Sequence, residues 1–202
     1  GETFQTPEAV LVYSSQGLND MSQIYTGCTG ADWQGDTGVI ASAILINNWG
    51  NLLSILTEEK LLQLASRAQK CGIELFVLDD GWFGARSSSK AGLGDWEANR
   101  DRLPNGLSGL AQKIEALGMK FGLWIEPEMV NADSDLFRTH PDWILQVPGR
   151  TPCHGRYQYV LDFSRQEILD YIYEKIVSIL EGASISYIKW DMNRSLSDVW
   201  SR

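Results

Sequence analysis

The feature that most constrains the fold is an alternation of apolar strands and amphipathic helices between residues 43 and 191. Four short apolar runs, each suited to one buried strand, occupy residues 43–49, 73–82, 119–129 and 185–191. The segments 57–72, 106–118 and 165–182 carry leucine, isoleucine and alanine at helical spacing. This alternation predicts an α/β fold with parallel strands joined by right-handed helical crossovers.

The first crossover helix has recognisable ends. Thr57 precedes the periodic apolar residues and is a predicted N-cap, and Gly72 follows their last turn. Residues 1–42 are instead rich in Gly, Ser, Thr, Asn and Asp. We therefore expect an irregular lead-in over residues 1–42 and an ordered domain over residues 43–202.

Polar residues gather at the C-terminal end of each predicted strand, in "INNW", "LDDGW", "IEPEM" and "IKWD". That end carries the sites of (β/α)8 barrels and of open α/β sheets alike. Acids and tryptophans there, with no glycine-rich phosphate loop after the first strand, favour the TIM-barrel type. Such a barrel has eight βα units and about 250 residues. The sequence shows only about four units, so we expect residues 43–202 to be the N-terminal half of a (β/α)8 catalytic domain.

The last predicted strand ends in a lysine and an aspartate two residues apart. Alternation along a strand places Tyr187, Lys189 and Asp191 on one face. A nearby ammonium group keeps a carboxylate ionised and lowers its pKa, and a carboxylate nucleophile needs that state. An ordinary ion pair at the end of a strand is the structural alternative, and the pattern alone leaves both open.

The second predicted strand ends in two adjacent aspartates, Asp79 and Asp80. Such a pair repels itself and loses hydration, so it needs compensating groups. A ligand with many hydroxyl groups would supply donors, and a metal ion could also compensate the charge. A structural turn through Gly81 is the alternative.

Tryptophans accompany these acids. Trp49, Trp82, Trp96 and Trp124 lie at predicted strand ends or in the loops that follow, and Glu126 shares a strand face with Trp124. Flat aromatic faces beside carboxylates suit a sugar, which is apolar on its C–H faces and rich in donors at its edges. Any one of these tryptophans taken alone is more typical of a core residue, and it is the four together that favour a sugar-binding rim.

Composition disfavours several classes of partner. A net charge of −9 makes nucleic acid an improbable partner. The three cysteines are widely spaced and lack a CxxC motif, and the two histidines lack metal-ligand spacing, so we expect neither a disulfide scaffold nor a zinc site built on cysteine or histidine. No stretch is long enough to span a membrane, and the first residues lack a signal-peptide pattern, which favours a cytoplasmic location. Four basic residues are expected to form a solvated loop face: Arg86, Lys90, Arg100 and Arg102.

Several motifs occur together in one order: "LINNW", "ELFVLDDGWFG", "GLWIEPEMV", "HPDWIL", "VLDFSR" and "YIKWDMNR". Together they resemble the α-galactosidases of glycoside hydrolase family 36, from roughly residue 44 to residue 194. The resemblance implies a (β/α)8 barrel and a retaining reaction, without a cofactor, that releases terminal α-linked galactose from oligosaccharides such as melibiose and raffinose. The implied partner is an α-galactoside substrate, and the resemblance is compatible with a homo-oligomer of the full-length enzyme.

The resemblance also implies roles for individual residues. Asp191 corresponds to the catalytic nucleophile. Asn193 and Arg194, in the same motif, are given a supporting role only. The residues implied to bind the sugar are Trp49, Asp79, Asp80, Trp124 and Lys189.

The sequence departs from the family pattern around its first strand. An acid and aromatics are expected after Trp49, where this chain has Gly50, Asn51 and Leu52, and the segment before residue 43 lacks the expected arginine and proline. The family's general acid/base, an aspartate on a later strand, is expected beyond Arg202, and the β-sandwich that usually precedes the barrel is likewise expected outside residues 1–202. We therefore expect this chain alone to have little or no activity.

Two other functions remain open. A non-catalytic galactose-binding or scaffold protein would keep the sugar pocket without the reaction. A metal-dependent barrel hydrolase would use Asp79, Asp80 and Glu126.

Overall fold

The computed structural model describes residues 3, 5–6, 9–32, 43–50, 56–197 and 199–201. The chain divides into two compact units, Gly1–Ser42 and Ala43–Arg202. The predictions about residues 33–42 and 51–55 lie outside the described residues.

The first unit contains helix α1, Leu18–Asp32. The prediction of an irregular lead-in is therefore wrong for these residues. Gly17, with a φ of 95°, precedes the helix, and the next nine residues contain neither glycine nor proline. Good helix formers such as Leu18, Met21 and Gln23 outweigh the polar composition that suggested a loop.

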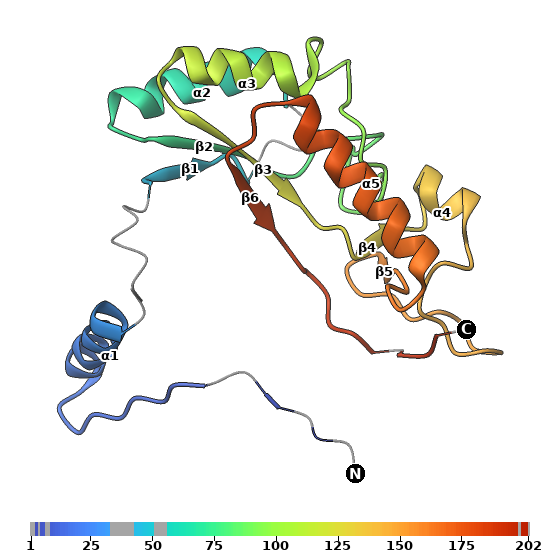
Figure 1. Cartoon of the computed structure of the whole chain (residues 1–202), viewed down its shortest axis with the longest axis horizontal. Coiled ribbons are helices and arrows are strands. Elements are labelled where there is room, and N and C mark those ends of the chain that lie inside the picture. The colour runs from blue at the N-terminus through green and yellow to red at the C-terminus, as the bar shows by residue number, and fades with distance from the viewer. Residues whose placement is uncertain are drawn as a thin grey trace. The chain divides into compact units, whose positions relative to one another are not determined.

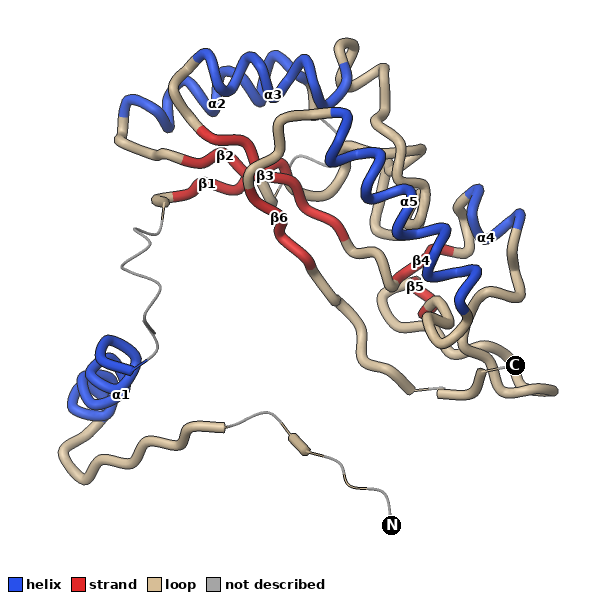
Figure 2. Tube along the Cα trace, viewed as in Figure 1, coloured by secondary structure: helices blue, strands red, loops and turns tan. Residues whose placement is uncertain are grey.

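The second unit is built on a four-stranded parallel sheet, in the order β1-β2-β3-β6. Its strands are β1 (Leu45–Asn47), β2 (Leu75–Leu78), β3 (Lys120–Ile125) and β6 (Tyr187–Trp190). Each lies within one of the four predicted apolar runs, and the α/β prediction is confirmed. Within the described part of the chain, β1 and β6 are the edges of this sheet (Figure 2).

Three long helices connect these strands: α2 (Glu58–Lys70), α3 (Gly106–Ala116) and α5 (Gln166–Gly182). Helices α2 and α3 lie side by side over the sheet (Figure 1). The Thr57 hydroxyl caps α2 by accepting from the Lys60 N–H, and Gly72 follows the helix with a φ of 81°, so both predicted ends are confirmed.

Three short elements follow β3 that the sequence did not predict. Strands β4 (Met129–Asn131) and β5 (Gln158–Val160) pair antiparallel beyond the C-terminal end of β3, and the five-residue helix α4 (Asp135–Thr139) follows β4 (Figure 2). This group supplies a wall next to the strand ends.

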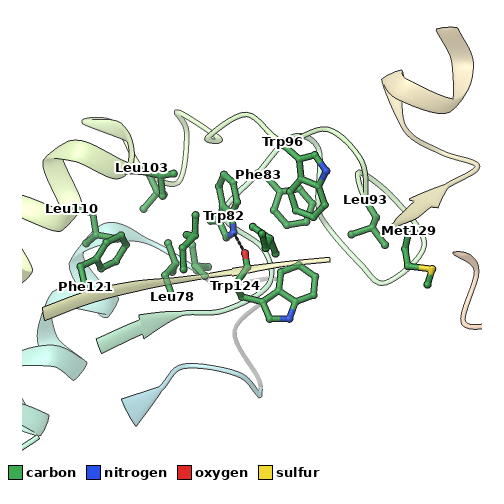
Figure 3. Close-up of a cluster of buried hydrophobic side chains, with 14 of the residues drawn as sticks. Leu78, Trp82, Phe83, Leu93, Trp96, Leu103, Leu110, Phe121, Trp124 and Met129 are labelled. Atoms are coloured by element: carbon green, nitrogen blue, oxygen red, sulfur yellow. Dashed lines mark hydrogen bonds between the residues drawn. The ribbon is translucent and has the colours of Figure 1, made fainter. Parts of the chain in front are cut away.

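An aromatic cluster fills the space between β3 and the loop after β2. Trp82, Phe83, Trp96 and Trp124 are at most 2% exposed, and the Phe83 and Trp96 ring centroids are 4.7 Å apart (Figure 3). The Trp82 indole donates to the Trp124 carbonyl over 3.0 Å. Sheet, helices and loop therefore share one core, which fixes the strand ends relative to the loops above them.

Candidate active site

The C-terminal ends of the four parallel strands bring distant polar residues together. Lys189, after the middle of β6, donates to Asp79 at the end of β2 over 2.8 Å, although the two are 110 residues apart. Asn47, at the end of β1, donates to the same carboxylate oxygen over 2.5 Å. Asp79 is only 1% exposed, so its bonds to Lys189 and Asn47 join three strands in a partly dry setting.

Asp80 has a different partner. Arg86 forms a bidentate ion pair with Asp80, with Nε and Nη2 at 2.7 and 2.6 Å from the two carboxylate oxygens. Arg86 is 2% exposed. The adjacent aspartates therefore tolerate each other because each meets its own cation.

The prediction of a solvated basic loop face is wrong for two of its members. Arg86 is buried against Asp80, and Arg102 donates to the carbonyl of Gly81. Burial lowers the pKa of Arg102. The loop folds back over the strand end, so its arginines compensate charges and carbonyls that the loop itself encloses.

Asp191 lies directly after β6 and receives three hydrogen bonds. Trp124 Nε1 and Asn193 Nδ2 each donate to Oδ2 over 2.8 Å, and the Met192 N–H donates to Oδ1 over 3.0 Å. Burial by itself raises the pKa of Asp191, but these donors and the charge of Lys189 outweigh it and hold the pKa below its ordinary value. The carboxylate is thus kept ionised chiefly by its donors, whereas the direct partner of Lys189 is Asp79.

Glu126 follows β3 and is 1% exposed. Its oxygens accept from the Asn193 N–H over 2.5 Å and from Gln158 Nε2 over 3.2 Å. Burial raises the pKa of Glu126, the negative charge of Asp191 adds to the rise, and the two donors oppose it. Two nearby carboxyl groups thus have pKa values shifted in opposite directions, an arrangement common at functional sites.

These side chains line one hollow of about 200 Å³ at the carboxyl ends of the strands. Its size suits a small polar molecule, since pockets for drug-sized ligands measure about 300–1,000 Å³. Acids, amides and three cationic side chains form most of its wall, together with two indoles. The lining residues are Trp49, Asp79, Asp80, Arg86, Trp124, Glu126, Arg156, Gln158, Lys189, Asp191 and Asn193.

The structure separates the four tryptophans of the sequence analysis. Trp49 is 71% exposed and lines the hollow. The indole nitrogen of Trp124 points away from the Trp82 and Phe83 rings in Figure 3 and meets Asp191, so this residue is both core and wall. Trp82 and Trp96 do not line the hollow and belong to the core, which makes the prediction of four rim tryptophans wrong for these two.

Arg194 lies beside the hollow. It is 9% exposed and donates to the carbonyls of Cys153 and Gln158, both over 2.9 Å. It thereby anchors the turn that carries Arg156, in keeping with a supporting position.

Sequence reasoning missed Arg156 and Gln158, which come from the turn leading into β5. Arg156 Nη1 donates to Asn193 Oδ1 over 2.6 Å. Arg156 and Tyr157 both adopt the left-handed conformation, with φ of 52° and 62°, which is uncommon for residues other than glycine. No residue pattern in "HGRYQY" predicts this turn, because it is stabilised by contacts with distant segments of the chain.

Among the described residues, no three acidic, histidine or cysteine side chains gather into a group that could hold a metal ion. No helix in the described ranges is long and apolar enough to cross a membrane.

Comparison with known proteins identifies close relatives. The model of the Melibiase family matches residues 3–202. The chain is 52% identical over 202 residues to the α-galactosidase AgaA of Geobacillus stearothermophilus, covering 100% of this chain and 28% of that protein. It is 46% identical over 206 residues to the α-galactosidase Mel36A of Lactobacillus acidophilus, covering 98% and 27%.

Solved structures give the same result. The crystal structure of a variant of AgaA, a glycoside hydrolase family 36 α-galactosidase, in complex with raffinose superimposes with a TM-score of 0.77 at 52% identity. The match covers 79% of this chain and 22% of that one. The chain therefore spans less than a third of the length of the relatives it matches.

Proposed function

The chain belongs to the Melibiase family, and from that premise we propose that it forms the nucleophile-bearing part of a retaining α-galactosidase. The substrate would be a terminal α-linked galactose on an oligosaccharide such as melibiose or raffinose. Relatives named as α-galactosidases, one of them crystallised with raffinose, support this substrate class. The open sheet would be the first half of a (β/α)8 barrel that later strands complete.

The observation that carries the proposal is the ionised carboxylate of Asp191 on the wall of a small polar hollow. In a retaining reaction, one Asp191 oxygen attacks the anomeric carbon of galactose while the bond to the leaving oxygen breaks. The leaving oxygen takes a proton from a second carboxylic acid. Water, deprotonated by the same second group, then releases galactose from the ester with Asp191.

The other residues of the hollow would bind and orient the sugar. Asp79 and Asp80 present acceptors to hydroxyl groups, while Lys189 and Arg156 present donors. The indole of Trp49, which is 71% exposed, offers a flat face to the sugar ring, and Trp124 adds its edge to the wall. Asn193 would act indirectly, since it links the nucleophile to Glu126 and to Arg156.

The second carboxyl group of a retaining pair lies about 5–5.5 Å from the first. Glu126 is a poor choice for it, because it is only 1% exposed and is held within the wall by hydrogen bonds from Asn193 and Gln158. We propose that the acid/base is an aspartate outside this chain and that residues 1–202 alone hydrolyse little or no substrate. A cytoplasmic location and a homo-oligomer of the whole enzyme stay predictions.

The test is hydrolysis of p-nitrophenyl α-galactoside by the protein expressed from its complete gene and, separately, by residues 1–202. We expect turnover by the former, a loss of at least about 10³-fold in Asp191→Asn, and none by the latter. Turnover by residues 1–202 that disappears in Asp191→Asn would show that the acid is already present in this chain. Full activity of Asp191→Asn in the complete protein would refute the proposed nucleophile.

A galactose-binding or scaffold protein without catalysis is the second candidate, because the sugar-binding wall is largely built within this chain. Calorimetry with galactose separates the two. Binding heat without hydrolysis by the complete protein, lost in Trp124→Ala, would favour the second candidate.

A further inference from the structure

Asn131, the last residue of β4, is fully buried and does not line the hollow. Its Oδ1 accepts from Arg86 Nη1 and from the Leu93 N–H, both over 2.9 Å. Its Nδ2 donates to the carbonyls of Ser89 and Tyr157 over 3.2 and 2.8 Å. Both acceptor sites and both donors of the amide are used, so its orientation is fixed.

One side of this amide leads to Asp80. Arg86 holds the two oxygens of Asp80 with Nε and Nη2, and its remaining nitrogen, Nη1, donates to Asn131 and to the Ala91 carbonyl. A planar guanidinium held on both of its edges cannot rotate. Asn131 therefore restrains the direction in which the Asp80 carboxylate faces the hollow.

The other side leads to Arg156. Asn131 donates to the carbonyl of Tyr157, the second of two consecutive residues in the left-handed conformation. Such a backbone persists only where its surroundings hold it. The adjacent Arg156 reaches Asn193 in the wall of the hollow. Lys90 adds a second tie, with its ammonium 4.4 Å from the centre of the Tyr157 ring.

We infer that Asn131 is a positioning residue that sets the placement of Asp80 and Arg156 in the wall of the hollow. It touches neither the ligand nor the reacting atoms. The inference deepens the proposed function and rests on it, because the ligand is taken to be galactose.

The test is Asn131→Asp, which keeps the shape of the side chain. The new carboxylate lacks the two N–H donors of the amide, so one of its oxygens faces the carbonyls of Ser89 and Tyr157 without a hydrogen bond. Its negative charge also competes with Asp80 for Arg86. The matched control is Ser134→Ala, since Ser134 is also fully buried and follows β4, but bonds only the backbone carbonyl of Asn131 and the N–H of Phe137.

Galactose binding is measured by calorimetry on the protein expressed from its complete gene. We expect about tenfold to hundredfold weaker binding in Asn131→Asp, because small misplacements of binding groups have effects of that size. Ser134→Ala should bind within about twofold of the parent protein. Equal affinities of Asn131→Asp and Ser134→Ala would overturn the inference.

A double-mutant cycle separates positioning from general destabilisation. If Asn131 acts through Arg156, the losses caused by Asn131→Asp and Arg156→Lys are less than additive when combined. Fully additive losses would overturn the inference. If Asn131→Asp does not fold, Arg86→Lys is used in its place. Lysine keeps the positive charge but cannot hold both oxygens of Asp80 and bond Asn131 at the same time. Unchanged galactose affinity in Arg86→Lys would overturn the inference.

Hydrogen exchange of residues 155–158 supplies a readout that needs no ligand. Faster exchange in Asn131→Asp than in Ser134→Ala is expected, and equal exchange would overturn the inference. If the parent protein does not bind galactose at all, the proposed function fails, while the exchange comparison still decides the role of Asn131.

Discussion

At the scale of single residues, the site depends on how donors are distributed between two carboxyl groups. Asp191 receives three hydrogen bonds and is only partly buried, whereas Glu126 receives two and is almost fully enclosed. The balance of burial and donors lowers the pKa of the first and raises that of the second. Asn193 serves both, through its side chain for Asp191 and its backbone for Glu126.

Replacement of Trp124 by phenylalanine should raise the pKa of Asp191. The change removes the N–H that donates to Oδ2 and keeps an aromatic face. A nucleophile must be ionised, so activity falls as the pH drops through its pKa, and a raised pKa moves that fall to higher pH. The pKa of Asp191 is read from the acid limb of the pH profile of kcat/KM for an aryl α-galactoside. Trp143→Phe, outside the hollow, is the control. An unmoved acid limb in Trp124→Phe would contradict this account of Asp191.

Glu126 should make stability depend on pH in the opposite sense to a salt-bridged carboxylate. Its pKa is raised in the folded state, so its contribution to the free energy of unfolding is present at low pH and is lost as pH rises through the folded value. Between pH 4.5, its ordinary value, and neutrality, the parent protein should lose more stability than Glu126→Gln.

Thermal unfolding at stepped pH measures this difference, with the exposed Glu181→Gln as the control. Parallel curves for the parent protein and Glu126→Gln would mean that the Glu126 carboxyl does not carry the effect.

At the scale of elements, the site exists because parallel strands end on one side of the sheet. The register pairs Trp124 with Lys189 and Gly122 with Tyr187, which brings the ends of β3 and β6 level. A Cβ on Gly122 would lie 3.1 Å from the Tyr187 ring and 3.2 Å from its carbonyl oxygen. Glycine at this position therefore allows the two strands to approach closely.

Gly122→Ala should destabilise the fold by about 1–3 kcal/mol, the usual cost of overpacking a core. It should also weaken galactose binding, since Lys189 lies on the displaced strand. Gly182→Ala is the control, because nothing lies near its added Cβ and alanine favours a helix. Denaturant unfolding measures the change, and equal stabilities of the two variants would refute the tight β3–β6 contact.

The elements that local signals define could be predicted from the sequence. Apolar runs gave the four parallel strands, and the Thr57 cap and Gly72 gave the ends of α2. The pairing of β4 with β5 and the turn at Arg156 could not be predicted, because β5 and the turn are held by Asn131 of β4 and by Arg194, both far from them along the chain. Arg86 was misjudged because its position in a loop does not show that the loop folds back onto Asp80.

At the scale of the whole molecule, the sheet ends at two strands, β1 and β6, each of which has no further strand beside it among the described residues. Tyr187 and Trp190 of β6 are 41% and 54% exposed, and Leu45 of β1 is 44% exposed. Apolar edge strands with free backbone groups invite pairing with other chains. The same edges would accept the strands that complete a barrel.

Residues 1–202 produced alone should therefore self-associate. Sedimentation velocity at increasing protein concentration is expected to show larger species, and Trp190→Lys on β6 should reduce them. Tyr173→Lys is the control, since Tyr173 is 66% exposed on α5 and away from the sheet edge. Association that responds equally to both variants would place the contact elsewhere.

The Lys189–Asp79 ion pair spans 110 residues of the chain and joins β6 to β2 across β3. This ion pair cannot form until β6 has docked beside β3, so the hollow is complete only after β6 has joined the sheet. A sugar that fits it can bind no earlier intermediate. Bound galactose would then indicate that the hollow is fully formed. Expression of the protein in cells supplied with galactose would raise the yield of correctly folded protein, because a ligand that binds only the folded state stabilises it.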